Sequence, residues 1–303
     1  MLTRRDALAR LAAISGGSML HLGAVLPDTA PRRWWSDVQQ GDPALAPGAP
    51  MSPERRALID AFSKSSDGVE RRFDARQFVS DWTMPYRLFR PKAPGLLPLV
   101  VYLHGSGGLG TDNEGQLKLG NIFGTRLFAL PANQERFPCY VVAPQTDRGW
   151  INYGPPAPGQ NTATPAAGLG DGARAALALI DALIGEFPID PRRVYVTGQS
   201  MGGAGVWHLT AERPRFFAGA VAICGSRSLD DPAASARTAL WNFHGDADQT
   251  VPITESRGRV AAVCHAGGRP IATEYAGVNH NSWEWAFTEP NLLPWLFAQR
   301  RGG

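Results

Sequence analysis

The chain has 303 residues, of which 44% are hydrophobic and 19% are charged, and its formal net charge at pH 7 is +3. Length and composition predict a globular protein with one large domain, or one domain with an appendage. The charge is too small and too scattered for a nucleic-acid-binding surface, and the body of the chain has no run of 18 apolar residues that would predict a membrane span.

The chain has three cysteines, Cys139, Cys224 and Cys264. Their spacing matches no metal-ligand pattern, and the histidines and carboxylates do not cluster in one either, so we predict no metal and no cofactor. Three cysteines allow at most one disulfide bond within the chain, and the sequence leaves open whether any two of them pair.

The N-terminal segment has features of an export signal. Arg4 and Arg5 precede a mildly apolar stretch, Leu11–Leu26, as in twin-arginine signals. We therefore expect residues 1–30 to direct export to the periplasm or out of the cell; the alternative is a plain N-terminal helix with a chance arginine pair. Residues 31–52 are rich in proline, glycine and alanine, which predicts a linker.

From residue 53 onward the chain is predicted to alternate strands with helices. It begins with an amphipathic helix at 53–64 and a hairpin of strands at 73–80 and 84–90. Apolar runs then predict buried strands at Pro98–Leu103, Phe137–Pro144, Arg193–Thr197, Gly219–Ile223, Ala239–Phe243 and Ile271–Tyr275, and helices are predicted at Asp171–Phe187, Gly203–Ala211 and Asn291–Arg300. This order predicts an α/β fold with a doubly wound, mostly parallel sheet, in which sites lie at the carboxyl ends of the strands.

The most informative motif is Gly198-Gln199-Ser200-Met201-Gly202, which reads G-x-S-x-G. It lies between the predicted strand 193–197 and the predicted helix 203–211. A serine on such a sharp turn exposes its hydroxyl, and the flanking glycines tolerate the strained backbone and the close approach of the helix. The motif predicts Ser200 as a nucleophile, although by itself it also fits an ordinary glycine-rich β–α turn.

A serine nucleophile needs an imidazole within hydrogen-bonding distance, and the chain has six histidines. His280 lies in a loop after the last predicted strand, so the hydrolase order of serine, acid and histidine selects it as the base. His104 and His244 each precede a glycine at a strand end, where we expect structural roles, and His208 is expected to pack in the helix after Ser200. The alternative for His280 is a loop histidine bonded to the backbone.

The acid that orients the base is expected between Ser200 and His280, just after a strand. The segment His244-Gly245-Asp246-Ala247-Asp248 offers two carboxylates. Asp248 lies farther along the loop and is the preferred candidate, whereas Asp246 is expected to brace the turn. Since aspartates are common in turns, turn chemistry is the alternative for both.

The oxyanion hole needs two backbone N–H groups. One is expected from Met201, at the start of the helix after Ser200, where the helix dipole adds to the effect. The other is expected from the glycine-rich loop Leu103–Gly108, with the N–H of Ser106 as the first candidate and that of Gly107 as the second.

Residues near these loops are candidates for shaping a substrate pocket. Trp150 and Trp283 each either line the pocket or pack in the core. Asp112 and Asn113 are expected to hold the oxyanion loop by hydrogen bonds. Gly154–Gly170 is predicted to be a proline- and glycine-rich loop long enough to border a cleft.

Together these motifs resemble the α/β-hydrolases known as predicted peptidases, which are close to carbohydrate esterase family 1, feruloyl esterases and poly(3-hydroxybutyrate) depolymerases. The resemblance spans Tyr86–Arg301 and rests on Leu103–Gly108, Gly110–Asn113, Ala143–Gln145, Asp190–Tyr195, His244–Asp248 and Asn279–Trp283. It implies a single α/β-hydrolase catalytic domain, residues 53–303, with a triad of Ser200, Asp248 and His280. Dienelactone hydrolases share the fold but have cysteine at the elbow, so Ser200 argues against that branch.

Three functions compete for this pattern. The leading prediction is a serine hydrolase that cleaves carboxylic esters through an acyl-enzyme, with a small-molecule or polymer-linked ester as substrate. A serine peptidase of the prolyl-oligopeptidase type is the alternative, which we disfavour because the sequence has no propeller or large gating domain. A catalytically inactive binding protein is disfavoured by the full set of triad candidates in hydrolase order. The fold does not choose among acetyl, feruloyl and hydroxyalkanoate esters.

Overall fold

The fold is built on one mixed β-sheet. A computed structural model of the chain describes residues 53–156, 163–166, 170–225 and 230–302. Within these residues an eight-stranded sheet has the order β1 (Asp74–Val79), β2 (Thr83–Phe89), β4 (Tyr140–Pro144), β3 (Leu97–Leu103), β7 (Ile189–Gln199), β8 (Gly219–Ile223), β9 (Ala239–Gly245) and β10 (Ile271–Tyr275). Six neighbouring strands of this sheet are parallel to one another: β4, β3, β7, β8, β9 and β10. The β1–β2 hairpin extends the sheet beyond β4, and β2 pairs antiparallel with β4. The predicted α/β class and mostly parallel sheet are confirmed.

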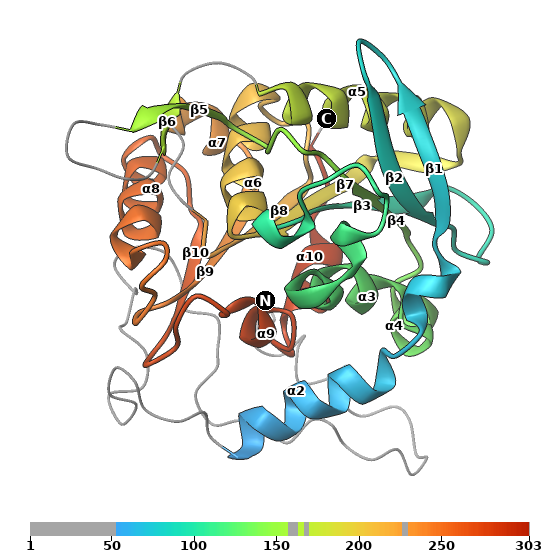
Figure 1. Cartoon of the computed structure of the whole chain (residues 1–303), viewed down its shortest axis with the longest axis horizontal. Coiled ribbons are helices and arrows are strands. Elements are labelled where there is room, and N and C mark those ends of the chain that lie inside the picture. Colours follow the sequence, from blue (N-terminus) through green and yellow to red (C-terminus); the bar gives the residue numbers. More distant parts are fainter. Residues whose placement is uncertain (1–52, 157–162, 167–169, 226–229, 303) are drawn as a thin grey trace, which may run out of the picture.

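Helices cover both faces of the sheet (Figure 1). One face packs against α5 (Asp171–Glu186), α6 (Met201–Glu212) and α8 (Ile253–His265), and the other against α2 (Pro53–Ser65), α3 (Ile122–Ala129), α9 (Trp283–Ala286) and α10 (Leu292–Ala298). Successive strand residues point to opposite faces, so Leu99 and Val101 of β3 join the first core, while Val100 and Tyr102 join the second. Because both faces are covered, β3, β4 and β8 are buried along their whole length, which explains their continuous apolar runs.

The predicted strands and helices are present, with their ends displaced by a few residues. The largest displacement is in β7, which begins at Ile189, where it pairs with Leu97 of β3. The sequence pattern missed α3 and α4 (Pro131–Arg136), which lie between β3 and β4. Both are short, and α3 contains Gly124, which weakens any helix signal. A Cβ at Gly124 would lie 2.0 Å from the ring of Tyr102, so this position needs glycine for packing.

Part of the segment 154–170, which was predicted to be a loop, forms β-strands instead. It contributes to a two-stranded antiparallel ribbon of β5 (Asn152–Pro156) and β6 (Ala163–Ala166), although residues 157–162 and 167–169 lie outside the described residues. The two strands contain three prolines, Pro155, Pro156 and Pro165, and each strand of a two-stranded ribbon has an edge at which proline is tolerated.

The predicted export signal, residues 1–30, and linker, residues 31–52, also lie outside the described residues. Within the part of the chain that the structure describes, no helix has both the length and the apolar character to cross a membrane.

Candidate active site

Ser200 lies on a sharp turn between β7 and α6. Its backbone has φ 53° and ψ −119°, a sparsely populated region for a residue with a side chain. A Cβ at Gly202 would lie 2.0 Å from the carbonyl oxygen of Leu103, and one at Gly198 would lie 2.6 Å from the carbonyl oxygen of Gly202. The strand and the helix therefore approach so closely that both flanking positions need glycine, as the motif predicts.

The structure brings Ser200, His280 and Asp248 into one hydrogen-bonded chain. Nε2 of His280 lies 2.9 Å from Oγ of Ser200, and Nδ1 of the same ring lies 2.7 Å from Oδ2 of Asp248. The three residues follow β7, β9 and β10, three parallel strands whose carboxyl ends share one edge of the sheet. The imidazole is 18% exposed and the carboxylate is fully buried, so solvent reaches the base but not the acid. The geometry is that of a nucleophile, base and orienting acid; the catalytic roles themselves stay predictions.

Four hydrogen-bond donors surround the carboxylate of Asp248. Oδ1 accepts the backbone N–H groups of Thr250 and Val251 at 2.8 and 2.9 Å, and Oδ2 faces the imidazoles of His280 and His244 at 2.7 and 3.1 Å. Burial raises the pKa of this carboxyl, but the hydrogen bonds from the two histidines and from Val251 outweigh it and hold the pKa well below its usual range. Asp248 is therefore ionised at neutral pH.

Two polar side chains tie the acid loop to the base loop. Asp246 accepts the backbone N–H of Gly277 at 2.7 Å, which agrees with the predicted bracing role. Asn279 was not among the residues selected from the sequence, yet its Oδ1 accepts the backbone N–H of Gln249 at 3.1 Å and that of His280 at 2.7 Å. An asparagine directly before the candidate base was the available signal.

The candidate oxyanion donors flank the elbow. Met201 begins α6 and Ser106 begins a short 3₁₀ helix, Ser106–Gly108, and the first N–H groups of a helix have no partner within it. A Cβ at Gly105 would lie 3.6 Å from Cβ of Ser200, so the loop contacts the nucleophile turn. The N–H of Gly105 is bonded to Asn121 at 2.9 Å, which leaves Ser106 and Gly107 as the loop candidates.

Asp112, Asn113 and Gln145 hold this loop in place. Asp112 accepts hydrogen bonds from Nε2 of Gln145 at 2.7 Å and from the backbone N–H of Glu114 at 2.9 Å, and the same Nε2 lies 3.1 Å from the carbonyl oxygen of Gly108. The hydrogen bond from Gln145, followed by those from the backbone, lowers the pKa of Asp112 to about 2. The backbone N–H of Asn113 donates to Oε1 of Gln145. The predicted bracing role of Asp112 and Asn113 agrees with these contacts.

A small pocket of about 120 Å³ opens at Ser200. Its lining consists of Gly105, Ser106, Gly107, Leu119, Gly120, Asn121, Gln199, Ser200, His280 and Trp283. The ring of Trp283 meets that of His280 edge to face, with centroids 5.4 Å apart. Leu119, which sequence reasoning did not select, is 74% exposed and has a φ of 52°. An apolar side chain held out on a strained backbone at a pocket rim is suited to contact substrate.

Trp150, a candidate for the pocket lining, packs in the core instead, which corrects its selection as a substrate-binding residue. The ring is 0% exposed, packs in the core against the position of Gly205, and donates its indole N–H to the carbonyl oxygen of His104 at 2.8 Å. His104 is likewise buried and structural, as expected: its Nε2 accepts the N–H of Thr146 at 3.2 Å. Burial lowers the pKa of His104 to about 4, although a hydrogen bond to the carbonyl of Gly105 opposes the shift, so the ring is neutral at pH 7.

Among the described residues, two groups bring three potential metal-ligand atoms within 4.8 Å of one another: Cys224, Asp248 and His280, and His208, Glu212 and Asp230. In the first group the carboxylate and the imidazole already bind each other, and burial raises the pKa of the Cys224 thiol to about 12, which disfavours the thiolate that a metal requires. In the second, His208 is buried and bonded to Asp230 at 2.8 Å. The described part of the chain includes all three cysteines, and no two of them form a disulfide bond there.

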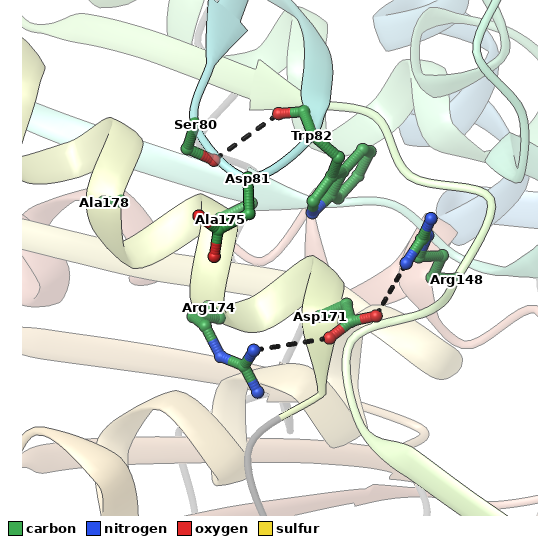
Figure 2. A pocket seen from close by; sticks show the side chains of 8 residues that line it. All are labelled: Ser80, Asp81, Trp82, Arg148, Asp171, Arg174, Ala175 and Ala178. Carbon is green, nitrogen blue, oxygen red and sulfur yellow. Dashed lines mark hydrogen bonds and ion pairs between the residues drawn. The ribbon is translucent and has the colours of Figure 1, made fainter.

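A second cavity, of about 190 Å³, lies between the β1–β2 turn and the start of α5. Figure 2 shows its charged rim, where Asp171 pairs with Arg148 at 2.7 Å and with Arg174 at 3.5 Å. The guanidinium of Arg148 also lies 5.3 Å from the ring of Trp82. These charged side chains are about half exposed, and the cavity lining includes no histidine or cysteine. Ser80 lines this cavity, but the lining has no imidazole that could serve as its base, as His280 can for Ser200.

No protein-family model matches the chain. The chain is 30% identical over 262 residues to a protein from Nocardia uniformis subsp. tsuyamanensis named "Putative esterase NocK", an alignment that covers 83% of this chain and 66% of that protein. It is also similar to the crystal structure of a thermostable esterase, with 32% identity, a TM-score of 0.68 and coverage of 77% of this chain and 64% of the other. The chain thus spans just under two thirds of the length of these two relatives.

A third similarity concerns the fold alone. The fluorophosphonate-binding serine hydrolase FphF of Staphylococcus aureus is 13% identical, with a TM-score of 0.55 and coverage of 75% of this chain and 98% of that one. The sheet order, the strained serine between β7 and α6, and these similarities agree with one another. The chain has the α/β-hydrolase fold and belongs to the α/β-hydrolase superfamily.

Proposed function

We propose that the protein is a serine esterase that hydrolyses carboxylic esters with a small acyl group through an acyl-enzyme. The observation that carries the proposal is the hydrogen-bonded chain from Asp248 through His280 to Ser200, which ends at a pocket. The two relatives at 30% and 32% identity are both named as esterases, which supports ester over amide substrates.

In the first half-reaction, Oγ of Ser200 attacks the ester carbonyl carbon and its proton passes to Nε2 of His280. The carbonyl oxygen becomes an oxyanion, which the N–H groups of Ser106 and Met201 stabilise; the loss of one such donor costs about 2.7–4 kcal/mol of transition-state stabilisation. His280 then gives its proton to the leaving alcohol oxygen as the C–O bond breaks. In the second half-reaction, His280 takes a proton from water, whose oxygen attacks the carbonyl carbon of the acyl-serine. His280 then returns this proton to Oγ of Ser200 as the bond between Oγ and the acyl carbon breaks and the carboxylic acid leaves.

The size and lining of the pocket support a small acyl group. The pocket measures about 120 Å³, and its large apolar side chains are Leu119 and Trp283. It is bounded by the oxyanion loop on one side and by the base loop on the other, so a long acyl chain would have to extend past the rim. Acetyl, propionyl and butyryl esters are the substrates that fit these dimensions best.

Two experiments test the proposal. A fluorophosphonate probe is expected to label the wild type and not Ser200→Ala; equal labelling would refute the nucleophile. A panel of p-nitrophenyl acetate, butyrate and octanoate, a feruloyl ester and a peptide p-nitroanilide is then expected to give the highest kcat/KM with the shortest acyl groups. Turnover of the anilide with no turnover of any ester would instead support the peptidase alternative.

We also propose that the protein is exported by the twin-arginine route. The signal is the pair Arg4-Arg5, which precedes a mildly apolar stretch. A fusion of residues 1–52 to a reporter that is active only after twin-arginine export is expected to be exported. Replacement of both arginines by lysine should abolish export, and export that persists in this variant would contradict the proposal.

A further inference from the structure

A second histidine, His244, contacts the candidate acid. His244 lies in β9, four residues before Asp248, and its side chain is fully buried. Its Nε2 lies 3.1 Å from Oδ2 of Asp248, the same oxygen that binds His280. The position at a strand end had indicated a structural residue, but the contact is to the acid itself.

The neighbours of His244 determine which ring nitrogen carries a proton. Nε2 faces two acceptors, Oδ2 of Asp248 and the carbonyl oxygen of Val251 at 2.8 Å, so Nε2 must be protonated and donate. Nδ1 lies 2.6 Å from Oγ of Ser256, a buried serine whose hydroxyl supplies the donor for the neutral ring. The N–H at Nε2 is shared between the carbonyl of Val251 and Oδ2 of Asp248, and it is present in the neutral and in the charged imidazole alike.

The other charged side chains near the contact between His244 and Asp248 pair with each other. His244 and Ser256 border a cavity of about 210 Å³, whose charged lining residues are Arg257 and Glu274. These two form a bidentate pair, with N···O distances of 2.9 and 2.7 Å, so they present little net charge to His244. The Cys224 thiol, which lies within 4.8 Å of a carboxylate oxygen of Asp248, is buried and neutral at pH 7. Besides the backbone N–H groups of Thr250 and Val251, the electrostatic partners of Asp248 are therefore the two imidazoles.

We propose that His244 is a positioning residue for the triad. It fixes the carboxylate of Asp248 and thereby sets the pH range over which Ser200 is activated. The inference rests on the proposed esterase function. A donor on Oδ2 fixes the rotation of the carboxylate, and it also withdraws negative charge from the atom that holds the Nδ1 proton of His280. Without that donor, Oδ2 holds the proton of His280 more strongly, so the base becomes available only at higher pH.

A purely structural role is the competing explanation, because the contact from Nε2 to Val251 would hold the acid loop even if Asp248 gained nothing from it. A structural role predicts lower stability and an unchanged pH–rate profile. The positioning role predicts a profile that shifts with the donor at Nε2, so the profile separates the two.

The test compares His244→Met, which removes the donor at similar volume, with His244→Gln, whose amide nitrogen restores a donor near the position of Nε2. The pH dependence of kcat/KM for p-nitrophenyl acetate is measured from pH 5 to 9. His244→Met is expected to lower kcat/KM about 10- to 100-fold and to move the acidic limb to higher pH. His244→Gln is expected to restore the limb and most of the rate.

Two further variants complete the test. His208→Met is the matched control, since His208 is also buried and bonded to a carboxylate, and it should leave the limb in place. Ser256→Ala removes the hydroxyl that bonds Nδ1 of His244 but keeps the histidine itself, so it should move the acidic limb in the same direction by a smaller amount. This variant provides the readout if His244→Met does not fold. An unmoved limb in every folded variant would overturn the proposal.

The pH dependence of fluorophosphonate labelling of Ser200 gives a second readout that needs no ester. If labelling follows the predicted shift while every ester fails as a substrate, the esterase proposal fails and the positioning role stands. If the wild type hydrolyses esters and neither readout responds to His244→Met, the positioning role fails alone.

Discussion

Two serine–histidine pairs contact the carboxylate of Asp248, and the surroundings of the two serines differ. On one side Ser200 lies 2.9 Å from His280, and on the other Ser256 lies 2.6 Å from His244; both imidazoles contact Oδ2 of the same carboxylate. His280 uses Nδ1 for the acid and Nε2 for the serine, whereas His244 uses them in the reverse order. The connectivity from serine to carboxylate is otherwise equivalent.

The difference lies in what surrounds each serine. Ser200 has a φ of 53°, stands before the first turn of α6 and lines a pocket beside the oxyanion loop. Ser256 lies within α8 and is 2% exposed. A hydrogen-bonded serine, histidine and aspartate therefore does not by itself identify the candidate active site. Accessibility, a strained turn and adjacent N–H donors distinguish the candidate active site from its buried counterpart.

Replacement of the shared acid should have the largest effect on activity. In Asp248→Asn the amide can donate to Nδ1 of His280, which favours the wrong tautomer, so kcat for p-nitrophenyl acetate should fall about 10⁴-fold. Asp246→Asn is the matched control, because an asparagine oxygen can still accept the N–H of Gly277. It should retain most of the activity; a comparable loss in both variants would mean that the loop, and not the carboxylate, is required.

Addition of a methyl group at the nucleophile turn should have the next largest effect. Gly202→Ala places a Cβ 2.0 Å from the carbonyl oxygen of Leu103 and 2.9 Å from that of His104, and neither backbone atom can move independently of its strand end. We expect the free energy of unfolding to fall by about 3 kcal/mol or more, measured by urea denaturation. A variant as stable as the wild type would contradict the close packing of α6 on β3.

The pH dependence of stability should report the shared carboxylate. Its folded pKa lies below the unfolded value, so the ionised carboxylate stabilises the fold fully above the unfolded pKa of about 3.9, and this contribution is lost as the pH falls through the folded pKa. The stability difference between the wild type and Asp248→Asn should therefore be largest above pH 5 and shrink at lower pH, in urea denaturation at several pH values. A difference that does not vary with pH would show that the carboxylate charge is not the stabilising feature.

The parts of the site that lie within local motifs were predictable from sequence. Ser200 is set by five consecutive residues, and the acid and base loops follow β9 and β10, two consecutive strands that are neighbours in the sheet. Parallel strands bring their carboxyl ends together, so Ser200, Asp248 and His280 could be placed on one edge before their distances were known. The α/β fold followed from the same apolar runs.

The parts that depend on tertiary packing were not predictable. Trp150 follows a strand as a pocket residue could, but its ring turns toward Gly205, which leaves room for it in the core. Leu119 begins a three-residue 3₁₀ helix, Leu119–Asn121, which has no periodic pattern, and its positive φ has no sequence signal. The contact of His244 with Asp248 depends on how the loop after β9 turns back, which residue order alone does not specify.

Truncation of the pocket wall should have a moderate effect. Trp283→Ala removes the edge-to-face contact with His280 and part of the pocket lining, so kcat/KM for p-nitrophenyl butyrate should fall about tenfold. Trp82→Ala, at the rim of the cavity in Figure 2, is the control and should leave ester hydrolysis unchanged. An equal loss in the two variants would indicate that ester substrates also reach the second cavity.

The smallest expected effect concerns the helix that carries the buried serine. Gly258 lies inside α8, and a Cβ there would meet no atom within 4 Å, so Gly258→Ala should raise the free energy of unfolding by about 1 kcal/mol through helix propensity alone. The same substitution is therefore expected to have opposite signs in α6 and α8. Since α8 holds Ser256, its stabilisation should leave the acidic limb of the pH–rate profile in place. A shifted limb would show that hydrolysis is sensitive to the motion of α8, and it would connect the buried serine–histidine pair to catalysis through the helix as well as through His244.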